Sequence, residues 1–288
     1  MRDFDFLEPV SVAEASELMA RHGEDCRAYA GGTALLLALR QRLLSPTHLV
    51  SLAKIDALRG IAFDAGRGLR IGALTLHAEL ATAPLVRQHY PMLAHMAAHL
   101  ANPQIRNQGT LGGNLCYADP ATDPATCLLA LDAQIEVGSR RGTRLIAMGD
   151  FLVDYYTTAL EADELVVAVH VPPPPAGFIG RYTRFLRTPA EHRPLVNVAM
   201  AARNEHGICR DVRVVVGASV PIAARVARAE AALDGRAATR EHVVAAAAAA
   251  AEDVFAVSDA RGDEAYRRAM VRVVVRRTLL AAFGLGEE

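Results

Sequence analysis

The sequence predicts an α+β fold with two parts, a mixed part over residues 1–176 and an antiparallel sheet with a helix cluster over residues 177–288. Strand-like and helix-like segments alternate through the first part. Four consecutive prolines at positions 172–175 then form a stiff extended connector, because they can continue neither a sheet ladder nor a helix. Three strand-like runs and then three helical runs follow, an order typical of a sheet covered by helices.

The overall composition is that of an ordinary globular protein. A chain of 288 residues can form one large domain or two ordinary ones. The net charge of −1 provides no field that attracts nucleic acid. The longest apolar run, residues 243–251, is far shorter than the roughly 20 residues that span a bilayer, and no signal peptide opens the sequence. We therefore expect no nucleic-acid partner, no membrane span, and a cytoplasmic location with reduced thiols.

Side chains that carry chemistry are scarce. Lys54 is the only lysine and has no glycine-rich loop beside it, which excludes a P-loop or Schiff-base lysine. The four cysteines form no Cys-x-x-Cys pair, which argues against a zinc or iron–sulfur site. His95 and His99 are four residues apart but lack a third metal ligand. We predict no catalytic residue and no metal site, so a bound cofactor would have to supply any chemistry.

The elements of the first part are predicted from capping and turn signals. Ser11 and Glu14 fit a capping box at the start of the first helix, and Gly23 fits its end. Strands are expected over residues 26–30, 48–52, 69–74, 134–138, 143–147 and 164–171. Helices are expected over residues 12–21, 34–43, 75–81, 90–101 and 125–131. The polar, glycine-containing segment 104–114 is predicted to be a loop.

The elements of the second part follow from apolar periodicity. Strands are expected over residues 180–186, 197–203 and 209–216. Helices are expected over residues 222–233, 240–254 and 264–283. The alanine run at 245–251 is interpreted as a close-packed helix, because alanine is the best helix former.

The first candidate binding segment is the loop Ala30-Gly31-Gly32-Thr33-Ala34-Leu35, where a predicted strand enters a predicted helix. Glycine lets the backbone approach a ligand closely, and a helix start offers unpaired N–H groups and a favourable dipole. These features suit a diphosphate, to which the Thr33 hydroxyl could also donate. An ordinary tight turn is the alternative, because the spacing is not the G-x-G-x-x-G fingerprint of dinucleotide binding.

The second candidate segment is Gly109-Thr110-Leu111-Gly112-Gly113-Asn114. Successive backbone N–H groups in such a loop can form an anion-binding nest. The Asn114 amide could bond a hydroxyl or a diphosphate oxygen of a ligand, or the loop itself. A structural turn is again the alternative. Two such loops in one chain suggest a single elongated anionic cofactor that is held from both sides.

These loops resemble the flavin motifs of a known family. Residues 30–33, AGGT, resemble the first flavin motif of the FAD subunits of carbon monoxide dehydrogenase, xanthine dehydrogenase and related molybdenum hydroxylases. Residues 104–114, QIRNQGTLGGN, closely resemble the second motif, and the similarity continues through residues 118–124, ADPATDP. Further similarity at residues 4–9, 49–60 and 258–268 extends the resemblance over the whole chain.

The resemblance implies a fold and a set of FAD contacts. The expected fold is a two-part FAD-binding domain of the vanillyl-alcohol oxidase type over residues 1–176, split near 56–60, and a C-terminal domain of the carbon monoxide dehydrogenase flavoprotein type over 177–288. Matching positions imply contacts to FAD from Ala30, Gly31, Gly32, Thr33, Ala34, Leu35, Gly109, Thr110, Leu111, Gly112, Gly113 and Asn114. Ala34 stands where relatives often carry a polar residue.

Three further positions carry an implied contact, and two of them have an alternative role. Asp123 matches a position that contacts the cofactor, but it could equally cap the helix after Pro124. Tyr182 matches an aromatic residue near the flavin ring, but it could equally pack in the core. Val166 is expected to line the ring pocket.

The function implied is that of an electron-transfer subunit. Its expected partners are an iron–sulfur subunit with two 2Fe–2S clusters and a large molybdopterin subunit, and its electron acceptor would be NAD, a quinone or oxygen. One alternative is a stand-alone FAD oxidase or reductase, for which His77, His95 and His99 are the candidate bases or flavin anchors. Another is a non-catalytic protein whose glycine loops bind a different nucleotide.

Overall fold

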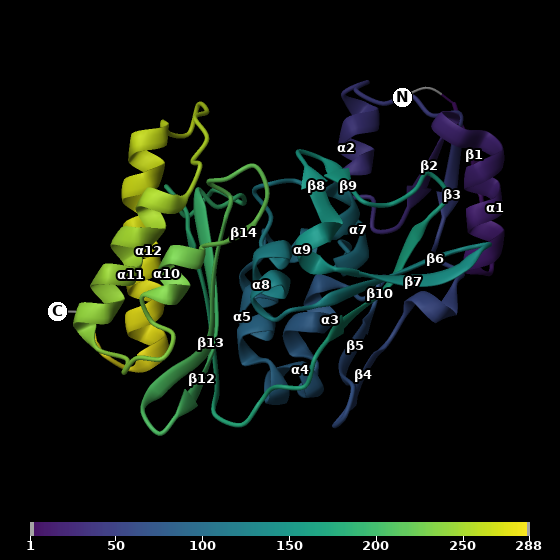
Figure 1. Ribbon diagram of the computed structural model, residues 1–288. Coiled ribbons are helices and arrows are strands. Elements are labelled where there is room, and N and C mark those ends of the chain that lie inside the picture. The colour runs from purple at the N-terminus through teal and green to yellow at the C-terminus, as the bar shows by residue number, and fades with distance from the viewer. Residues whose placement is uncertain (1–2, 287–288) are drawn as a thin grey trace.

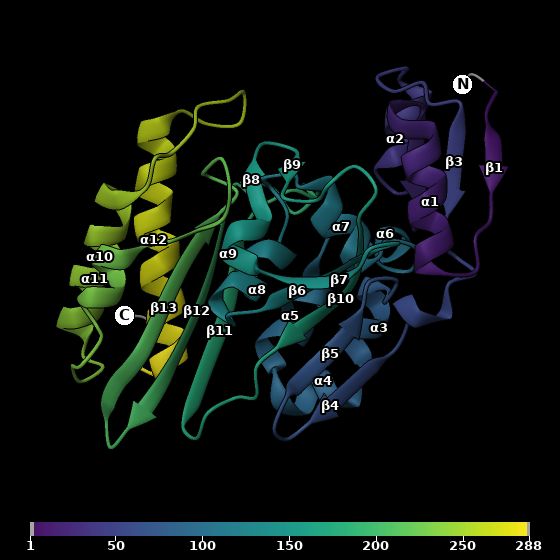
Figure 2. The same ribbon diagram turned by 45° about the vertical axis from the view of Figure 1, so that its right-hand side comes forward.

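The computed structural model describes residues 3–286. Residues 1–2 of the first predicted domain and residues 287–288 of the second lie outside the described residues. Figure 1 shows a succession of layers from the C-terminal helices on the left, through a sheet, a helical layer and a second sheet, to the N-terminal unit on the right. The turned view in Figure 2 shows the same succession. Among residues 3–286, no helix combines the length and apolar character that crossing a membrane requires.

The N-terminal unit is a small parallel sheet with one helix against it. Its strands are β1 (Asp5–Leu7), β3 (His48–Ser51) and β2 (Cys26–Tyr29), in that order. Helix α1 (Val12–His22) begins at the Ser11 cap and ends at Gly23, as predicted. The predicted capping box forms only in part. The Glu14 carboxylate accepts from the N–H of Val10 and not from that of the N-cap residue Ser11. Helix α2 (Leu35–Arg40) connects β2 to β3 and is shorter than predicted.

The second sheet is antiparallel and has five strands. Their order is β4 (Ile61–Asp64), β5 (Gly68–Gly72), β10 (Leu165–Val171), β6 (Gln134–Ser139) and β7 (Gly142–Ala147). Central strand β10 is apolar on both faces. Leu165 and Val167 pack in the core that contains α1 residues, whereas Val166 and Val169 pack in the opposite core. The pairing of β10 with β6 shifts register between Val166 and Ala168, and Leu165 and Val166 line the cavity described below.

A helical layer covers the second sheet and separates it from the C-terminal sheet. Its helices are α3 (His77–Thr82), α4 (Pro84–His89), α5 (Pro91–His99), α6 (Pro103–Arg106), α7 (Leu111–Tyr117), α8 (Pro124–Ala130) and α9 (Met148–Phe151). A short hairpin of β8 (Leu152–Asp154) and β9 (Thr157–Thr158) follows α9. The apolar side chains of this layer form one continuous core with the second sheet.

The C-terminal part is an antiparallel sheet that is apolar on both faces. Its strands are β11 (Phe178–Phe185), β12 (Val196–Glu205), β13 (Ile208–Gly217) and β14 (Ala224–Arg225). One face packs on α10 (Ala227–Ala231), α11 (Arg240–Asp253) and α12 (Glu264–Phe283). The other face packs on α5 and α8 through Tyr182, Ala199, Ala201 and Val215.

The structure corrects two predicted elements. The segment 104–114 is not a loop throughout, because α6 ends at Arg106 and α7 begins at Leu111. The two glycines at 112 and 113 lie in the first turn of α7, and their poor helix propensity concealed this helix. The predicted helix over 222–233 contains β14 and only the five residues of α10, because the chain first pairs with β13.

Candidate functional site

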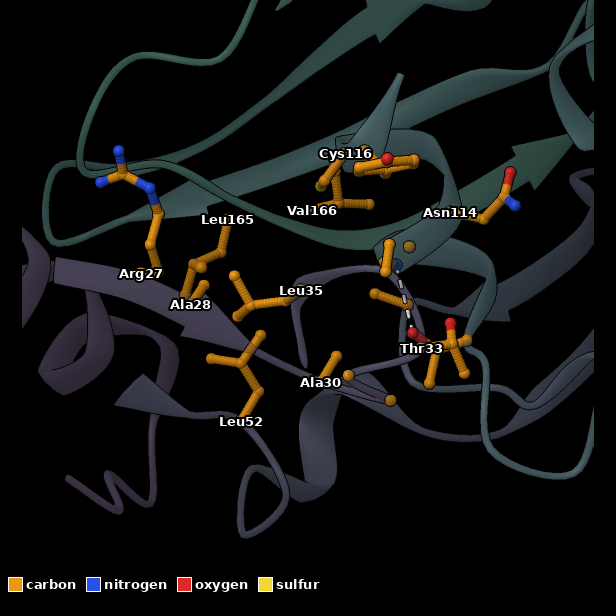
Figure 3. Close-up of a pocket in the computed structure, with 18 of the residues that line it drawn as sticks. Arg27, Ala28, Ala30, Thr33, Leu35, Leu52, Asn114, Cys116, Leu165 and Val166 are labelled. Atoms are coloured by element: carbon orange, nitrogen blue, oxygen red, sulfur yellow. Dashed lines mark hydrogen bonds between the residues drawn. The ribbon is translucent and has the colours of Figure 1, made fainter. Parts of the chain in front are cut away.

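The two glycine loops are in direct contact. A Cβ atom placed on Gly31 would lie 2.1 Å from the carbonyl oxygen of Gln108, so only glycine permits this approach. A Cβ atom placed on Gly113 would lie 3.8 Å from the Cβ of Ala30. Figure 3 shows Ala30 and Thr33 on one side of a pocket and Asn114, Cys116 and Val166 on the other. Segments far apart in the sequence therefore form opposite walls of one space.

This space is a cavity of about 590 Å³ between the N-terminal unit, helix α7 and strand β10. The predicted site residues that line it are Ala30, Gly31, Gly32, Thr33, Ala34, Leu35, Thr110, Gly112, Gly113, Asn114 and Val166. The other four predicted residues do not line it; these are Gly109, Leu111, Asp123 and Tyr182. Gly109 and Leu111 instead support the second loop, since the Gly109 carbonyl accepts from His77 and the Leu111 N–H donates to Thr75.

The first loop presents free backbone donors. Within residues 3–286, the N–H groups of Gly31, Gly32 and Thr33 have no hydrogen-bond acceptor. Gly32 has a φ of 70°, a conformation that glycine adopts without strain. Ala34 occupies the N-cap of α2 and its side chain caps nothing. Because α2 has only six residues, these donors matter more for anion binding than the helix dipole does.

The second loop is more tightly packed than the sequence indicated. The Gly112 N–H donates to the Ala73 carbonyl at 2.8 Å, and the Gly113 N–H donates to the Thr110 hydroxyl at 3.1 Å. A Cβ atom on Gly112 would lie 2.7 Å from the Cβ of Ala73. The N–H groups of both glycines are thus already bonded, so they do not form the free nest that was predicted. The Asn114 Oδ1 atom, in contrast, is buried and has no hydrogen-bond partner in the described residues.

Several lining residues were not among the predicted FAD contacts. They include Arg27, Ala28, Leu52, Leu100, Ile105, Cys116, Tyr117, Tyr156, Leu160, Glu164 and Leu165, and also His77, which was named only as a candidate base or flavin anchor of the alternative oxidase. Ala28 carried a usable signal, because it lies two residues before Ala30 and alternate residues of a strand share a face. Ile105 carried another, because it lies within the segment 104–114 that resembles the second flavin motif. Most of the others are brought to the cavity by segments distant from both glycine loops.

Cys116 is exposed where it lines the cavity, although many protein atoms surround its thiol. Burial raises the pKa of its thiol to about 12. Its thiol is therefore protonated at physiological pH, which makes Cys116 a poor nucleophile. The side chain contributes a soft apolar wall, and Figure 3 shows it beside Val166.

Asp123 and Tyr182 form a separate buried cluster. The Tyr182 hydroxyl donates to the Asp123 carboxylate, which also lies 3.5 Å from the Arg184 guanidinium and 3.5 Å from the Asn197 amide nitrogen. Burial raises the pKa of Asp123, although Arg184 opposes the shift. Burial, reinforced by the Asp123 charge, raises the pKa of Tyr182 well above 10.

The environment of this cluster bears on the capping and core alternatives given for Asp123 and Tyr182. The prediction that Asp123 caps the helix after Pro124 is wrong, because its side chain makes no capping bond to α8. Tyr182 is 1% exposed and belongs to the core, as its second interpretation expected. A contact of either residue with the flavin stays a prediction.

Residues from both parts of the chain meet at the tyrosine-lined edge of the cavity. The rings of Tyr117 and Tyr156, which both line the cavity, stand edge to face with centroids 5.3 Å apart. Arg193, from the segment between β11 and β12, pairs with Asp119 and lies 3.5 Å from the Tyr156 hydroxyl. The Arg261 guanidinium donates to the Arg193 carbonyl at 3.4 Å. The C-terminal part thus braces one edge of the cavity.

A deep cavity between two sheets, walled by two glycine loops and supplied with free N–H donors, defines a protein that binds an elongated phosphate-containing cofactor. Residues 2–174 match the family described as the FAD binding domain in molybdopterin dehydrogenase. Residues 181–282 match the CO dehydrogenase flavoprotein C-terminal domain.

Individual relatives agree with these matches. The chain is 36% identical over 277 residues to the nicotine 6-hydroxylase medium subunit of Paenarthrobacter nicotinovorans, with 96% of each chain covered. It is 32% identical over 280 residues to the carbon monoxide dehydrogenase medium chain of Hydrogenophaga pseudoflava, with 97% of each covered. A solved carbon monoxide dehydrogenase structure from Hydrogenophaga pseudoflava matches with a TM-score of 0.94 and 34% identity, over 98% of both chains.

This chain belongs to the family of FAD-binding subunits of molybdenum hydroxylases. The resemblance recognised in the sequence, the α+β fold and FAD as the cofactor are confirmed. The chain is accordingly a subunit of an oxidoreductase.

Proposed function

We propose that this chain binds FAD between its two glycine loops and serves as the electron-transfer subunit of a molybdenum-containing hydroxylase or dehydrogenase. The observation that carries the proposal is the approach of Gly31 to Gln108, which joins both loops in the wall of one cavity. Bound FAD supplies the chemistry of this subunit, because it accepts electrons one at a time and releases them as a pair. The protein's own residues bind, orient and shield it.

The lining residues suit FAD. We assign the diphosphate to the free N–H groups of Gly31, Gly32 and Thr33, which donate to anions without a competing acceptor. Thr110, Gly112, Gly113 and Asn114 form the opposite wall, and Val166 is assigned to the flavin-ring region. Buried polar atoms almost always have partners, and three around the second loop lack one within residues 3–286: Thr75 Oγ1, His77 Nδ1 and Asn114 Oδ1.

The remaining parts of the proposal concern the assembly. The names of the relatives include medium chains and a dehydrogenase complex subunit, which supports a multi-subunit assembly. We propose that its other members are an iron–sulfur subunit with two 2Fe–2S clusters and a large molybdopterin subunit. The proposed electron acceptor is NAD, a quinone or oxygen, and the proposed location is the cytoplasm.

We also propose domain boundaries near residues 56–60 and at residue 176. The first of these boundaries lies between the end of the first sheet at Ser51 and the start of the second sheet at Ile61.

The cofactor part of the proposal is tested by FAD binding to the full chain. FAD at a hundredfold excess over its Kd should stabilise the chain by about 2.7 kcal/mol and raise its melting temperature. Gly31→Ala should raise the Kd at least about tenfold, because its Cβ would separate the two loops. Gly149→Ala is the matched control, since its Cβ would meet only Leu129 at an ordinary 3.6 Å. An unchanged melting temperature with FAD, or equal Kd values for the two variants, would contradict the proposed site.

The electron-transfer part needs the assembled complex. The chain purified with its partners should show flavin absorption bands that bleach when the iron–sulfur clusters are reduced. A complex without extractable FAD, or flavin bands that persist after the clusters are reduced, would contradict this role.

A further inference from the structure

Helix α12 carries a row of arginines along its exposed face. Residues 265–286 contain five arginines and no aspartate or glutamate, although the whole chain has a net charge of −1. Arg267 points into the protein and is fully buried. Arg268, Arg272 and Arg276 are four residues apart, so they follow one face of the helix. Arg272 and Arg276 are exposed, and the Arg268 side chain is 36% exposed.

The packing and the capping of α12 do not explain this row. The opposite face, with Val271 and Val275, is buried in the C-terminal core. No arginine lies in the last turn of the helix, where a positive charge would complement the helix dipole. Arginines at this spacing repel one another, and within residues 3–286 only Arg268 of the three has a carboxylate partner, Glu264 at 3.0 Å. The positive charge of Arg272 and Arg276 is therefore available to a group from outside the chain.

The rest of this face suits close contact with another protein. Ala265 and Ala269 are exposed beside the arginines and allow a second surface to approach the helix, and Tyr266 is 42% exposed. Arginine and tyrosine are enriched in protein–protein interfaces, whereas aspartate and glutamate are depleted there. A guanidinium bonds a carboxylate through two parallel N–H groups, so the complementary surface is an acidic protein surface. The net charge of the chain provides no general attraction for nucleic acid or an anionic membrane.

The position of α12 selects the partner within the assembly. Figures 1 and 2 both show the C-terminal helices at the end of the molecule opposite the N-terminal unit, which forms one wall of the cavity. Electrons pass only between centres that lie close together, so an iron–sulfur subunit has to dock near the cavity. The large subunit delivers its electrons to the clusters and not to FAD directly, so it can contact the distant C-terminal helices.

We propose that the α12 arginine face, formed by Ala265, Arg268, Ala269, Arg272 and Arg276, docks against an acidic surface of the large molybdopterin subunit. This inference rests on the proposed function, because it takes that subunit as a partner. The face has no part in binding FAD, since no residue of α12 lines the cavity.

The test measures how tightly the full chain associates with its co-expressed partner subunits. Arg272→Glu combined with Arg276→Glu should raise the Kd of this association at least about tenfold, because two attractive contacts become repulsive. Replacing both residues with lysine keeps the charge and should preserve most of the affinity. Arg67→Glu combined with Arg236→Glu is the matched control, because these exposed arginines lie outside α12, and it should leave the Kd unchanged. All variants should bind FAD with the wild-type Kd.

A photo-crosslinking amino acid in place of Ala269 identifies the occupant in the purified complex, and we expect crosslinks to an acidic segment of the large subunit. Crosslinks to the iron–sulfur subunit or to a second copy of this chain would overturn the inference. A wild-type Kd in the glutamate variant would also overturn it, as would an equal loss of FAD affinity, which would indicate a misfolded chain. A wild-type chain that associates with no molybdopterin subunit would overturn the proposed function itself.

Discussion

At the scale of single residues, His77 links the stability of the fold to pH. Burial lowers the pKa of its imidazole from 6.5 to about 4. Between these values the unfolded chain binds a proton that the folded chain excludes. The free energy of unfolding therefore falls as the pH is lowered from 6.5 towards 4. The shift corresponds to a loss of roughly 3 kcal/mol by pH 4, at about 1.36 kcal/mol for each pKa unit.

Urea unfolding of the FAD-free chain at pH 7 and at pH 4.5 measures this loss. Carboxyl groups titrate in the same range, so the informative quantity is the difference between wild type and His77→Phe. The variant should lose less stability on acidification, because it has no buried imidazole to protonate. Equal losses in the two proteins would show that His77 is accessible to protons in the folded chain.

At the scale of elements, two helices share one kind of N-cap and differ in what surrounds it. The Thr110 hydroxyl caps α7 by accepting from Gly113, and the Thr239 hydroxyl caps α11 by accepting from His242 at 3.3 Å. Replacing either threonine with alanine should lower the free energy of unfolding by about 1 kcal/mol. Only Thr110 lines the cavity, so only Thr110→Ala should also weaken FAD binding.

Denaturant unfolding and FAD titration of the two variants separate stability from binding. Thr110→Ser and Thr239→Ser keep the hydroxyl and should restore most of the lost stability in each case. Similar FAD affinities for Thr110→Ala and Thr239→Ala would mean that the start of α7 does not shape the binding site.

At the scale of the whole molecule, the C-terminal sheet is buried on both faces. Its outer face carries α10, α11 and α12, whereas its inner face packs Tyr182, Ala199, Ala201 and Val215 against α5 and α8. An isolated fragment of residues 177–288 would leave this inner face in water. We expect the fragment to self-associate, because a continuous exposed apolar face of this kind promotes association.

Light scattering and the binding of a hydrophobic dye test this expectation, with the full chain as the control. The fragment should form oligomers and bind more dye than the full chain does. A monomeric fragment with a cooperative unfolding transition would show that residues 177–288 fold independently of α5 and α8.

The predictions that held depended on local signals. The cap at Ser11, the stop at Gly23 and the prolines at 172–175 each act within a few residues, so α1 and the connector followed from the sequence. The start of α7 was missed because Gly112 and Gly113 lie in its first turn, where packing against Ala73 outweighs their low helix propensity.

Sequence alone was sufficient for the family, the cofactor and most of the strands and helices, because motif residues and apolar periodicity are properties of contiguous segments. Tertiary structure was needed to show which donors are free at each loop, that Asp123 pairs with Tyr182, and that His77 enters the cavity. These features depend on contacts between segments that are distant in the chain. A hydrogen bond has a partner only once the fold has brought two such segments together.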